Sequence, residues 1–272
     1  MVFQVSKVPE LMKPRLTQPL ASWRVVAASA AGKRHVQQKQ PCQDAVRWQA
    51  EADGWLFAAV ADGAGSAKLG ELGAATAATA ALAALRQQFA STGVPRDATL
   101  AEAGLREVLR TARAAVVTEA TQRGAALGDL ATTLVCGVAG PAWAGAAQIG
   151  DGAVILGDRE GQLHSLTRPL AGEYLNETVF LTSENMLERA QFQTWSGGLR
   201  HLALFSDGLQ MLALKMPEGT PHAPFFKPLF TWLGRVADPD AARAELLAWL
   251  ASPRVTDRTD DDLTLLLAAR VD

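Results

Sequence analysis

The chain has 272 residues, of which 49% are hydrophobic and 20% charged, and its net charge is −2. A chain of this length can bury most of its apolar surface without disulfide bonds. The near-neutral charge argues against nucleic-acid binding, which is typical of domains with a basic excess. The two cysteines, Cys42 and Cys136, form neither a disulfide framework nor a zinc spacing and are interpreted as reduced cytosolic thiols.

We expect residues 1–22 to be an N-terminal extension and residues 23–272 to form one domain. The extension carries several charges and three prolines, so it lacks the apolar run of a signal peptide. Residues 130–150 are uncharged and long enough to span a membrane, but Gly140-Pro141 in their middle favours two strands joined by a turn. We therefore expect a cytoplasmic protein that binds neither membrane nor nucleic acid.

Short apolar runs that end in turn residues predict a framework of strands. In chain order they are residues 23–29, 55–61, 133–139, 143–149, 153–157, 162–166, 177–182, 202–206 and 263–270. The dipeptide Asp151-Gly152 lies between two of these runs and is typical of a type I′ hairpin. Residues 158–161 predict the next turn of the same meander.

Three helices are also predicted. Residues 69–89 are rich in alanine, so this helix can lie close to a sheet. Residues 99–123 open with a capping box and then place apolar residues on one face. The third helix has Asp238 as its N-cap and ends before Pro253.

Two segments, residues 168–198 and 222–232, are expected to be irregular. Strands with inserted helices, in place of strict alternation, indicate an α+β layered architecture.

Aspartates stand where predicted strands end or begin. Asp62 and Asp207 each follow a strand directly, and three consecutive aspartates, 260–262, precede the last strand. Such residues emerge at the rim of a sheet, where several can converge. Converging carboxylates raise one another's pKa unless a cation neutralises them, and oxygen ligands suit Mg²⁺ or Mn²⁺. Any single Asp-Gly pair is typical of a turn, so only the assembly supports a metal site.

Six short motifs, in the same order, resemble those of the metal-dependent protein phosphatases of the PP2C type, in particular the compact bacterial members. They are Gln43-Asp44-Ala45, Val60-Ala61-Asp62-Gly63-Ala64-Gly65, Ala131-Thr132-Thr133-Leu134, Ile149-Gly150-Asp151-Gly152, Phe205-Ser206-Asp207-Gly208 and Asp261-Asp262-Leu263-Thr264. The resemblance extends from about residue 23 to residue 270. It implies a four-layer α-β-β-α sandwich in which helices flank two mostly antiparallel sheets.

The resemblance also implies a set of metal ligands. Asp62 would bridge two ions, Mn²⁺ or Mg²⁺, and Gly63 would offer its carbonyl to one of them. Asp207 and Asp261 would complete the shell of one ion, and Asp44 would act there through water or from the outer shell.

A third, weaker ion is implied at Asp151. Asp260 and Asp262 are alternatives to Asp261, which the register of the family motif favours.

The mechanism that the resemblance implies is direct attack on phosphorus by a water activated between two metals, with no covalent phosphoenzyme. Lys39 stands five residues before Asp44, where the family usually has an arginine that binds phosphate, and Arg34 is the alternative. His35 is a candidate acid or phosphate contact, with a packing role as the other interpretation. Ala64 replaces a histidine that protonates the leaving group in many relatives.

One further departure concerns the outer shell, where Gln43 replaces the usual glutamate. The leading hypothesis is a phosphatase that acts on phosphoserine and phosphothreonine in proteins and opposes a bacterial Ser/Thr kinase. The alternatives are a catalytically weak sensor or scaffold and a phosphatase of small phosphorylated metabolites.

Overall fold

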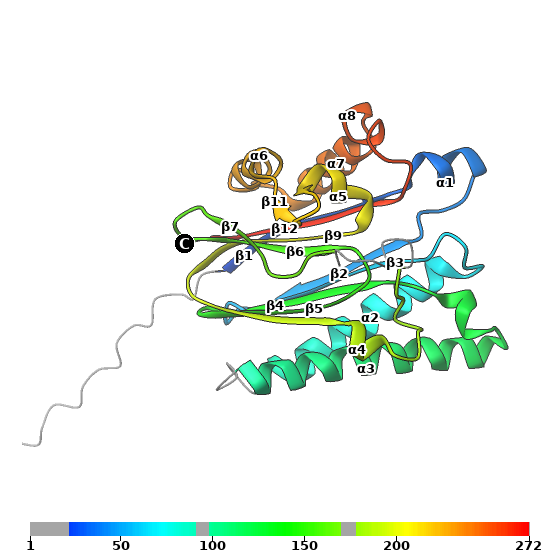
Figure 1. Ribbon diagram of the computed structural model, residues 1–272. Helices are drawn as coiled ribbons and strands as arrows, with labels where there is room; N and C mark the ends of the chain where they lie inside the picture. Colours follow the sequence, from blue (N-terminus) through cyan, green and yellow to red (C-terminus); the bar gives the residue numbers. More distant parts are fainter. Residues whose placement is uncertain (1–21, 91–97, 170–177, 272) are drawn as a thin grey trace, which may run out of the picture.

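The computed structural model describes residues 22–90, 98–169 and 178–271, which form two five-stranded antiparallel sheets packed face to face (Figure 1). The first sheet has the order β1 (Ser22–Ala30), β12 (Leu263–Val271), β9 (Leu199–Phe205), β6 (Ala153–Asp158) and β7 (Leu163–Ser165). The second has the order β2 (Asp44–Ala50), β3 (Leu56–Asp62), β4 (Leu134–Ala139), β5 (Trp143–Ile149) and β8 (Gln191–Ser196). A short hairpin pairs β10 (Leu214–Lys215) with β11 (Thr220–Pro221).

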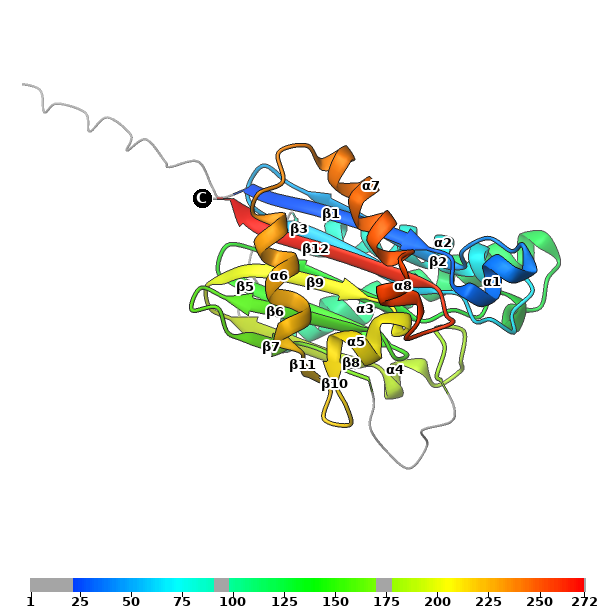
Figure 2. The same ribbon diagram turned by 90° about the horizontal axis from the view of Figure 1, so that it is seen from above.

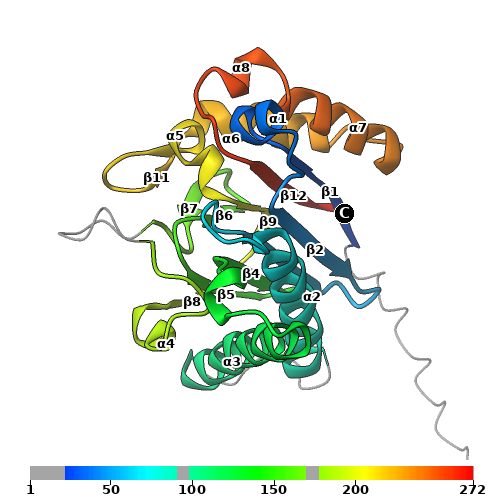
Figure 3. The ribbon, with the colours of Figure 1, turned by 90° about the vertical axis from the view of Figure 1, so that its right-hand side faces the viewer.

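Helices cover the outer face of each sheet, which confirms the predicted four-layer α-β-β-α sandwich (Figures 1 and 3). The second sheet carries α2 (Gly70–Phe89), α3 (Ala98–Arg123) and the short α4 (Met186–Arg189). The first sheet carries α5 (Gln210–Ala213), α6 (Ala223–Leu233), α7 (Pro239–Leu250) and α8 (Pro253–Thr256). One more short helix, α1 (Lys33–Gln38), lies at the end of the sandwich.

Three apolar clusters hold the four layers together. One lies between α2, α3 and the second sheet, one between the two sheets, and one between the first sheet and α5–α7. The buried face of α2 is mostly alanine, and a Cβ at its Gly73 would overlap the carbonyl of Leu130. The small residues therefore let this helix approach its neighbours closely, as predicted. In the described ranges, no helix is both long and apolar enough to cross a membrane.

The strands predicted at the sheet centres are confirmed to within a few residues, and the helix that begins after Asp238 is confirmed with its cap. The Asp238 side chain accepts hydrogen bonds from the backbone amides of Asp240 and Ala241. The residues predicted as the N-terminal extension lie outside the described part of the chain, except Ser22.

Four local predictions are wrong. The segments 168–198 and 222–232 are not wholly irregular, because they contain β8 and α6. Residues 178–182 form no strand, and residue 177 lies outside the described residues. In addition to the wrong predictions, the strand β2 was missed. These elements carry weak signals, because β2 and β8 are edge strands that are only partly buried and α6 contains Pro228.

The dipeptide Asp151-Gly152 is not a hairpin turn, which is the fourth wrong prediction. It connects β5 to β6, and these strands belong to different sheets. Gly150 has a φ of +101°, and a Cβ at Gly152 would lie 2.6 Å from the carbonyl oxygen of Phe205. The chain thus crosses between the sheets where positions 150 and 152 have no room for a side chain.

The registers bring one end of both sheets together. Asp44 pairs with Asp62 at the beginning of β2 and the end of β3, and Leu134 pairs with Ile149. In the other sheet, Ala153 and Leu265 both pair with Phe205 at the end of β9. The connections that follow β1, β3, β5 and β9 therefore meet at this end, on the right of Figures 1 and 2.

Candidate metal centre

Four carboxylates line one cavity at the end of the sandwich. Its volume is about 250 Å³, and Asp62, Asp151, Asp207 and Asp261 contribute to its wall. The other lining residues are Arg34, Ala64, Gly65, Ser66, Thr133, Thr178, Phe180. The structure therefore brings together four of the six ligands that the sequence predicted, from four separate connections.

Asp62 lies at the end of β3, and the neighbouring strand β4 holds its backbone. The hydroxyl of Thr132 donates to the carbonyl of Asp62 over 2.8 Å, and the amide of Thr133 donates to the same oxygen over 2.8 Å. The Asp62 amide donates to the Thr133 hydroxyl over 3.2 Å. These bonds fix the direction in which the Asp62 carboxylate enters the cavity.

Gly63 follows Asp62 and packs against the beginning of α2. A Cβ at Gly63 would overlap the backbone of Gly70, the first residue of α2. Only a glycine allows this approach. The backbone of Gly63 is therefore held in place against the first residue of α2.

Asp151 reaches the cavity because its connection crosses between the sheets. The hydroxyl of Thr178 donates to Oδ2 of Asp151 over 3.0 Å. Burial raises the pKa of the Asp151 carboxyl, with a smaller contribution from Asp261.

Asp44 is 8% exposed and lies directly opposite Asp62 in the β2–β3 ladder. Its Oδ2 accepts a hydrogen bond of 2.7 Å from the Ser206 hydroxyl, which in turn accepts one of 3.1 Å from the Thr264 amide. Burial raises the pKa of Asp44 to about 7, although the hydroxyl donors oppose the rise. Ser206 was not predicted to have a role of its own, because a hydroxyl beside a strand end offers no signal in one sequence.

The negative charges of these carboxylates raise one another's pKa. Burial, followed by the charges of Asp44, Asp207 and Asp261, raises the pKa of Asp62 well above its usual range. Burial and the charges of Asp151 and Asp261 raise the pKa of Asp207 to about 7. Negative charge is thus unfavourable here without a cation, as expected for converging carboxylates.

The residues present fit divalent cations of the hard class. Oδ1 of Asp44 and Oδ1 of Asp207 are buried and have no hydrogen-bond partner among the described residues. In the same part of the chain, no group of three or more His, Cys, Asp and Glu side chains is arranged to hold an ion by itself. An ion would therefore need water or a backbone carbonyl such as that of Gly63, and Mg²⁺ usually keeps several waters.

The three consecutive aspartates have different surroundings. Asp261 lines the cavity, whereas Asp262 is 2% exposed and accepts hydrogen bonds from the backbone amides of Gly32, at 2.7 Å, and Gln43, at 2.6 Å. Asp260 is exposed. This geometry supports the choice of Asp261 as the candidate ligand.

The two predicted cations, Lys39 and Arg34, and the predicted acid, His35, differ in their position relative to the cavity. Lys39 caps the end of α1 in the left-handed region, is exposed and does not line the cavity. Arg34 does line it, and its Nη2 occupies the space that a Cβ at Gly65 would take. His35 is 3% exposed, and its Nδ1 lies 2.8 Å from Oδ1 of Asp262. An enclosed ring outside the cavity wall does not fit the acid or phosphate contact that the sequence suggested.

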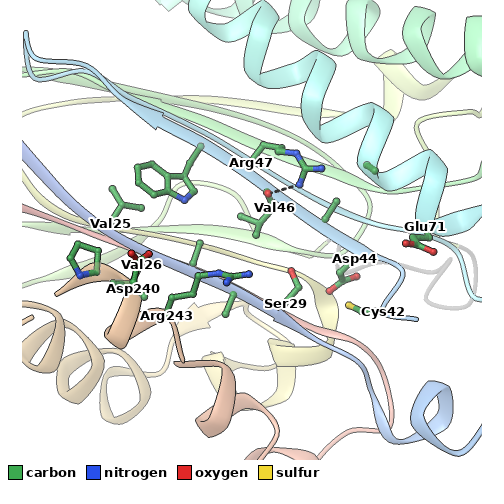
Figure 4. A pocket seen from close by; sticks show the side chains of 16 residues that line it. Val25, Val26, Ser29, Cys42, Asp44, Val46, Arg47, Glu71, Asp240 and Arg243 are labelled. Carbon is green, nitrogen blue, oxygen red and sulfur yellow. Dashed lines mark hydrogen bonds between the residues drawn. The ribbon is translucent and has the colours of Figure 1, made fainter. Parts of the chain in front are cut away.

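A larger groove of about 420 Å³ follows β1 and β2, the edge strands of the two sheets (Figure 4). Asp44 and Cys42 line one end, and Arg47 and Arg243 lie further along it. Burial, together with the charges of Asp44 and Asp262, raises the pKa of the Cys42 thiol. The groove therefore reaches the carboxylate cluster only at Asp44, and the converging acids belong to the smaller cavity.

Comparison with known proteins agrees with this fold. Structures of two bacterial enzymes align at low sequence identity, which shows a shared fold. The catalytic domain of the serine threonine protein phosphatase PstP, solved in complex with two manganese ions, aligns with a TM-score of 0.59 and 20% identity, covering 93% of this chain and 100% of that one. The serine/threonine phosphatase Stp1 from Staphylococcus aureus aligns with a TM-score of 0.60 and 17% identity, covering 96% and 100%.

Sequence comparison gives the family. Serine/threonine-protein phosphatase 3 of Escherichia coli strain K12 is 38% identical over 258 residues, which cover 91% of this chain and 98% of that protein. The family model described as protein phosphatase 2C matches residues 31–251. The chain therefore belongs to the protein phosphatase 2C family.

Proposed function

We propose that the chain hydrolyses phosphoserine and phosphothreonine in proteins, using two divalent ions, Mn²⁺ or Mg²⁺, with a third, weaker ion at Asp151. The observation that carries the proposal is the convergence of Asp62, Asp151, Asp207 and Asp261 on one cavity that Arg34 also lines. The name of the Escherichia coli relative and the manganese ions of the PstP domain support it.

The metal ligands in this proposal are Asp62, Asp207, Asp261, Asp44 through its buried Oδ1, the carbonyl of Gly63, and Asp151. When bound, the ions supply a water of lowered pKa and neutralise charge on the phosphoryl oxygens. The backbone contacts of these aspartates fix where the ions would bind, and therefore where that water would lie. No side chain of the protein forms a covalent bond to phosphorus in this scheme.

Arg34 is the cation of the cavity in this proposal. Its guanidinium can donate two parallel hydrogen bonds to phosphate oxygens, which a lysine cannot do. Arg34 therefore takes the role that the family resemblance gave to Lys39, with Arg34 as the alternative.

The leaving hydroxyl has no histidine beside it among the described lining residues of the cavity. Ala64 occupies the place where many relatives carry that acid. We therefore propose that water protonates the leaving oxygen.

Metal dependence tests the proposal directly. Hydrolysis of p-nitrophenyl phosphate and of phosphoserine and phosphothreonine peptides is expected with Mn²⁺ and is expected to fall to background in EDTA. Absence of turnover with Mn²⁺ and Mg²⁺ would favour a sensor or scaffold. Turnover of small phosphorylated metabolites in preference to all the peptides would instead favour a metabolite phosphatase.

We further propose a cytoplasmic enzyme that opposes a Ser/Thr kinase, and the two free cysteines support the compartment.

Gly65→Ala is expected to weaken phosphate binding without unfolding the chain. The added methyl group would meet Nη2 of Arg34, the far end of a flexible side chain, so the guanidinium must move while the backbone stays. We expect kcat/KM to fall about tenfold, since small displacements of positioning groups have large effects on rate. The melting temperature should change little. Gly161→Ala is the control, because a Cβ there meets nothing within 4 Å; its positive φ of 81° affects stability only. Wild-type kcat/KM in Gly65→Ala would contradict a role for Arg34.

A further inference from the structure

One buried carboxylate holds the whole connection between β1 and β2. Oδ1 of Asp262 accepts from the amide of Gly32 at 2.7 Å and lies 2.8 Å from Nδ1 of His35. Oδ2 accepts from the amide of Gln43 at 2.6 Å. Asp262 therefore fixes the beginning, the middle and the end of a connection whose residues are far from it in the chain.

Arg34 lies inside this clamp. It stands between Gly32 and His35, and its own amide donates to the carbonyl of Asp260 over 3.3 Å. A Cβ at Gly32 would overlap the backbone of Asp260 and Asp261, so the connection packs directly on the loop that carries Asp261 into the cavity. The backbone on both sides of Arg34 is thus tied to that loop.

His35 supplies the side-chain part of the clamp. With 3% exposure and its hydrogen bond to a carboxylate that is 2% exposed, it belongs to the protein interior. α1 is a short helix with no capping side chain, and His35 is its buried residue. Its other side-chain tie to the same region is the exposed ion pair of 2.8 Å between Lys33 and Asp257, and exposed pairs contribute little. Loss of the His35 contact would free the first turn of α1, where Arg34 is located.

We propose that His35 and Asp262 form a positioning pair that holds the Arg34 guanidinium at the cavity, where it binds the phosphate of the substrate. This inference rests on the proposed function for the identity of the anion. His35 is a positioning residue in it and touches no reacting atom.

A double-mutant cycle with inorganic phosphate as the probe tests the pair. Titration calorimetry would measure phosphate binding to the Mn²⁺-loaded full chain in the wild type, His35→Ala, Arg34→Ala and the double variant. We expect His35→Ala to weaken phosphate binding about tenfold in the wild-type background and less than about twofold in the Arg34→Ala background. The kcat/KM for a phosphopeptide should follow the same pattern.

His35→Asn provides a rescue variant, because its amide nitrogen is as many bonds from Cα as Nδ1 of histidine. It is expected to bind phosphate within about threefold of the wild type, and it keeps the test open if His35→Ala does not fold. His164→Ala is the matched control, since it removes a His–Asp contact of the same 2.8 Å length, to Asp158. It should leave phosphate affinity unchanged.

The pair is overturned if His35→Ala binds phosphate like the wild type, or if its effect is equally large with and without Arg34. A loss of Mn²⁺ affinity in His35→Ala without coupling to Arg34 would also overturn it. The pair would then position the metal ligand Asp261 and not the guanidinium of Arg34. Coupled phosphate binding in a chain that hydrolyses no phosphopeptide would sustain the pair and reject the proposed function.

Discussion

An Asp62→Asn variant is expected to hydrolyse phosphopeptides at least about 1,000-fold more slowly than the wild-type chain, measured as kcat at saturating Mn²⁺. Asp62 is partly buried and interacts with the charges of Asp44, Asp207 and Asp261. A neutral amide is a much weaker ligand for a hard divalent ion than a carboxylate is. Both Mn²⁺ affinity and turnover should therefore fall.

The fold is expected to survive this substitution. Removing one charge from a group of buried carboxylates relieves repulsion, so the melting temperature in EDTA should equal or exceed that of the wild type. Asp158→Asn is the control, because Asp158 also ends a strand but bonds to His164 outside the cavity. Near-normal kcat in Asp62→Asn would remove the basis for the metal centre.

The metal-free chain is expected to lose stability as the pH rises from about 4 to about 7. Burial raises the pKa of Asp44 and of Asp207 from 3.8 to about 7. Between these values the folded state binds more protons than the unfolded state, so the free energy of unfolding decreases with rising pH. Below the window both states are protonated at these groups, and above it both are ionised.

The expected loss is on the order of a few kcal/mol, because one unit of pKa corresponds to about 1.4 kcal/mol. For a chain of this size this means a fall in melting temperature of roughly 5–10 °C between pH 5 and pH 8 in EDTA. Calorimetry would measure it. Asp62→Asn should show a smaller fall, and saturating Mg²⁺ should raise the melting temperature most at pH 8. A chelated wild-type chain that becomes more stable over this range would count against the buried carboxylate cluster.

The aspartates of the cavity were predictable where they adjoin central strands. β3 and β9 are buried along most of their length, so their apolar runs are unambiguous and the polar residue that follows must lie at the rim. The two edge strands of the second sheet give no such signal. β2 and β8 mix buried or half-buried with exposed positions, and in a single sequence they resemble loops.

The choice between neighbouring candidates was less predictable. The family spacing from Asp44 favoured Lys39, but Arg34 lies in the first turn of α1 and lines the cavity, whereas Lys39 caps the other end of that helix and is exposed. The dipeptide at Asp151 has the composition of a hairpin turn. Whether it joins paired strands or crosses to the other sheet depends on packing that the dipeptide does not encode.

By itself, the sequence determined the layered α+β class, the central strands and the family, because local apolar periodicity and short motifs suffice for these. Only the tertiary structure decided which cation lines the cavity, which contacts Asp262 makes, and that the connection at Asp151 crosses between the sheets. The direction in which a loop side chain leaves the backbone depends on contacts between distant segments. The hydrogen bonds from Gly32 and Gln43 to Asp262 are such contacts, and no local pattern reports them.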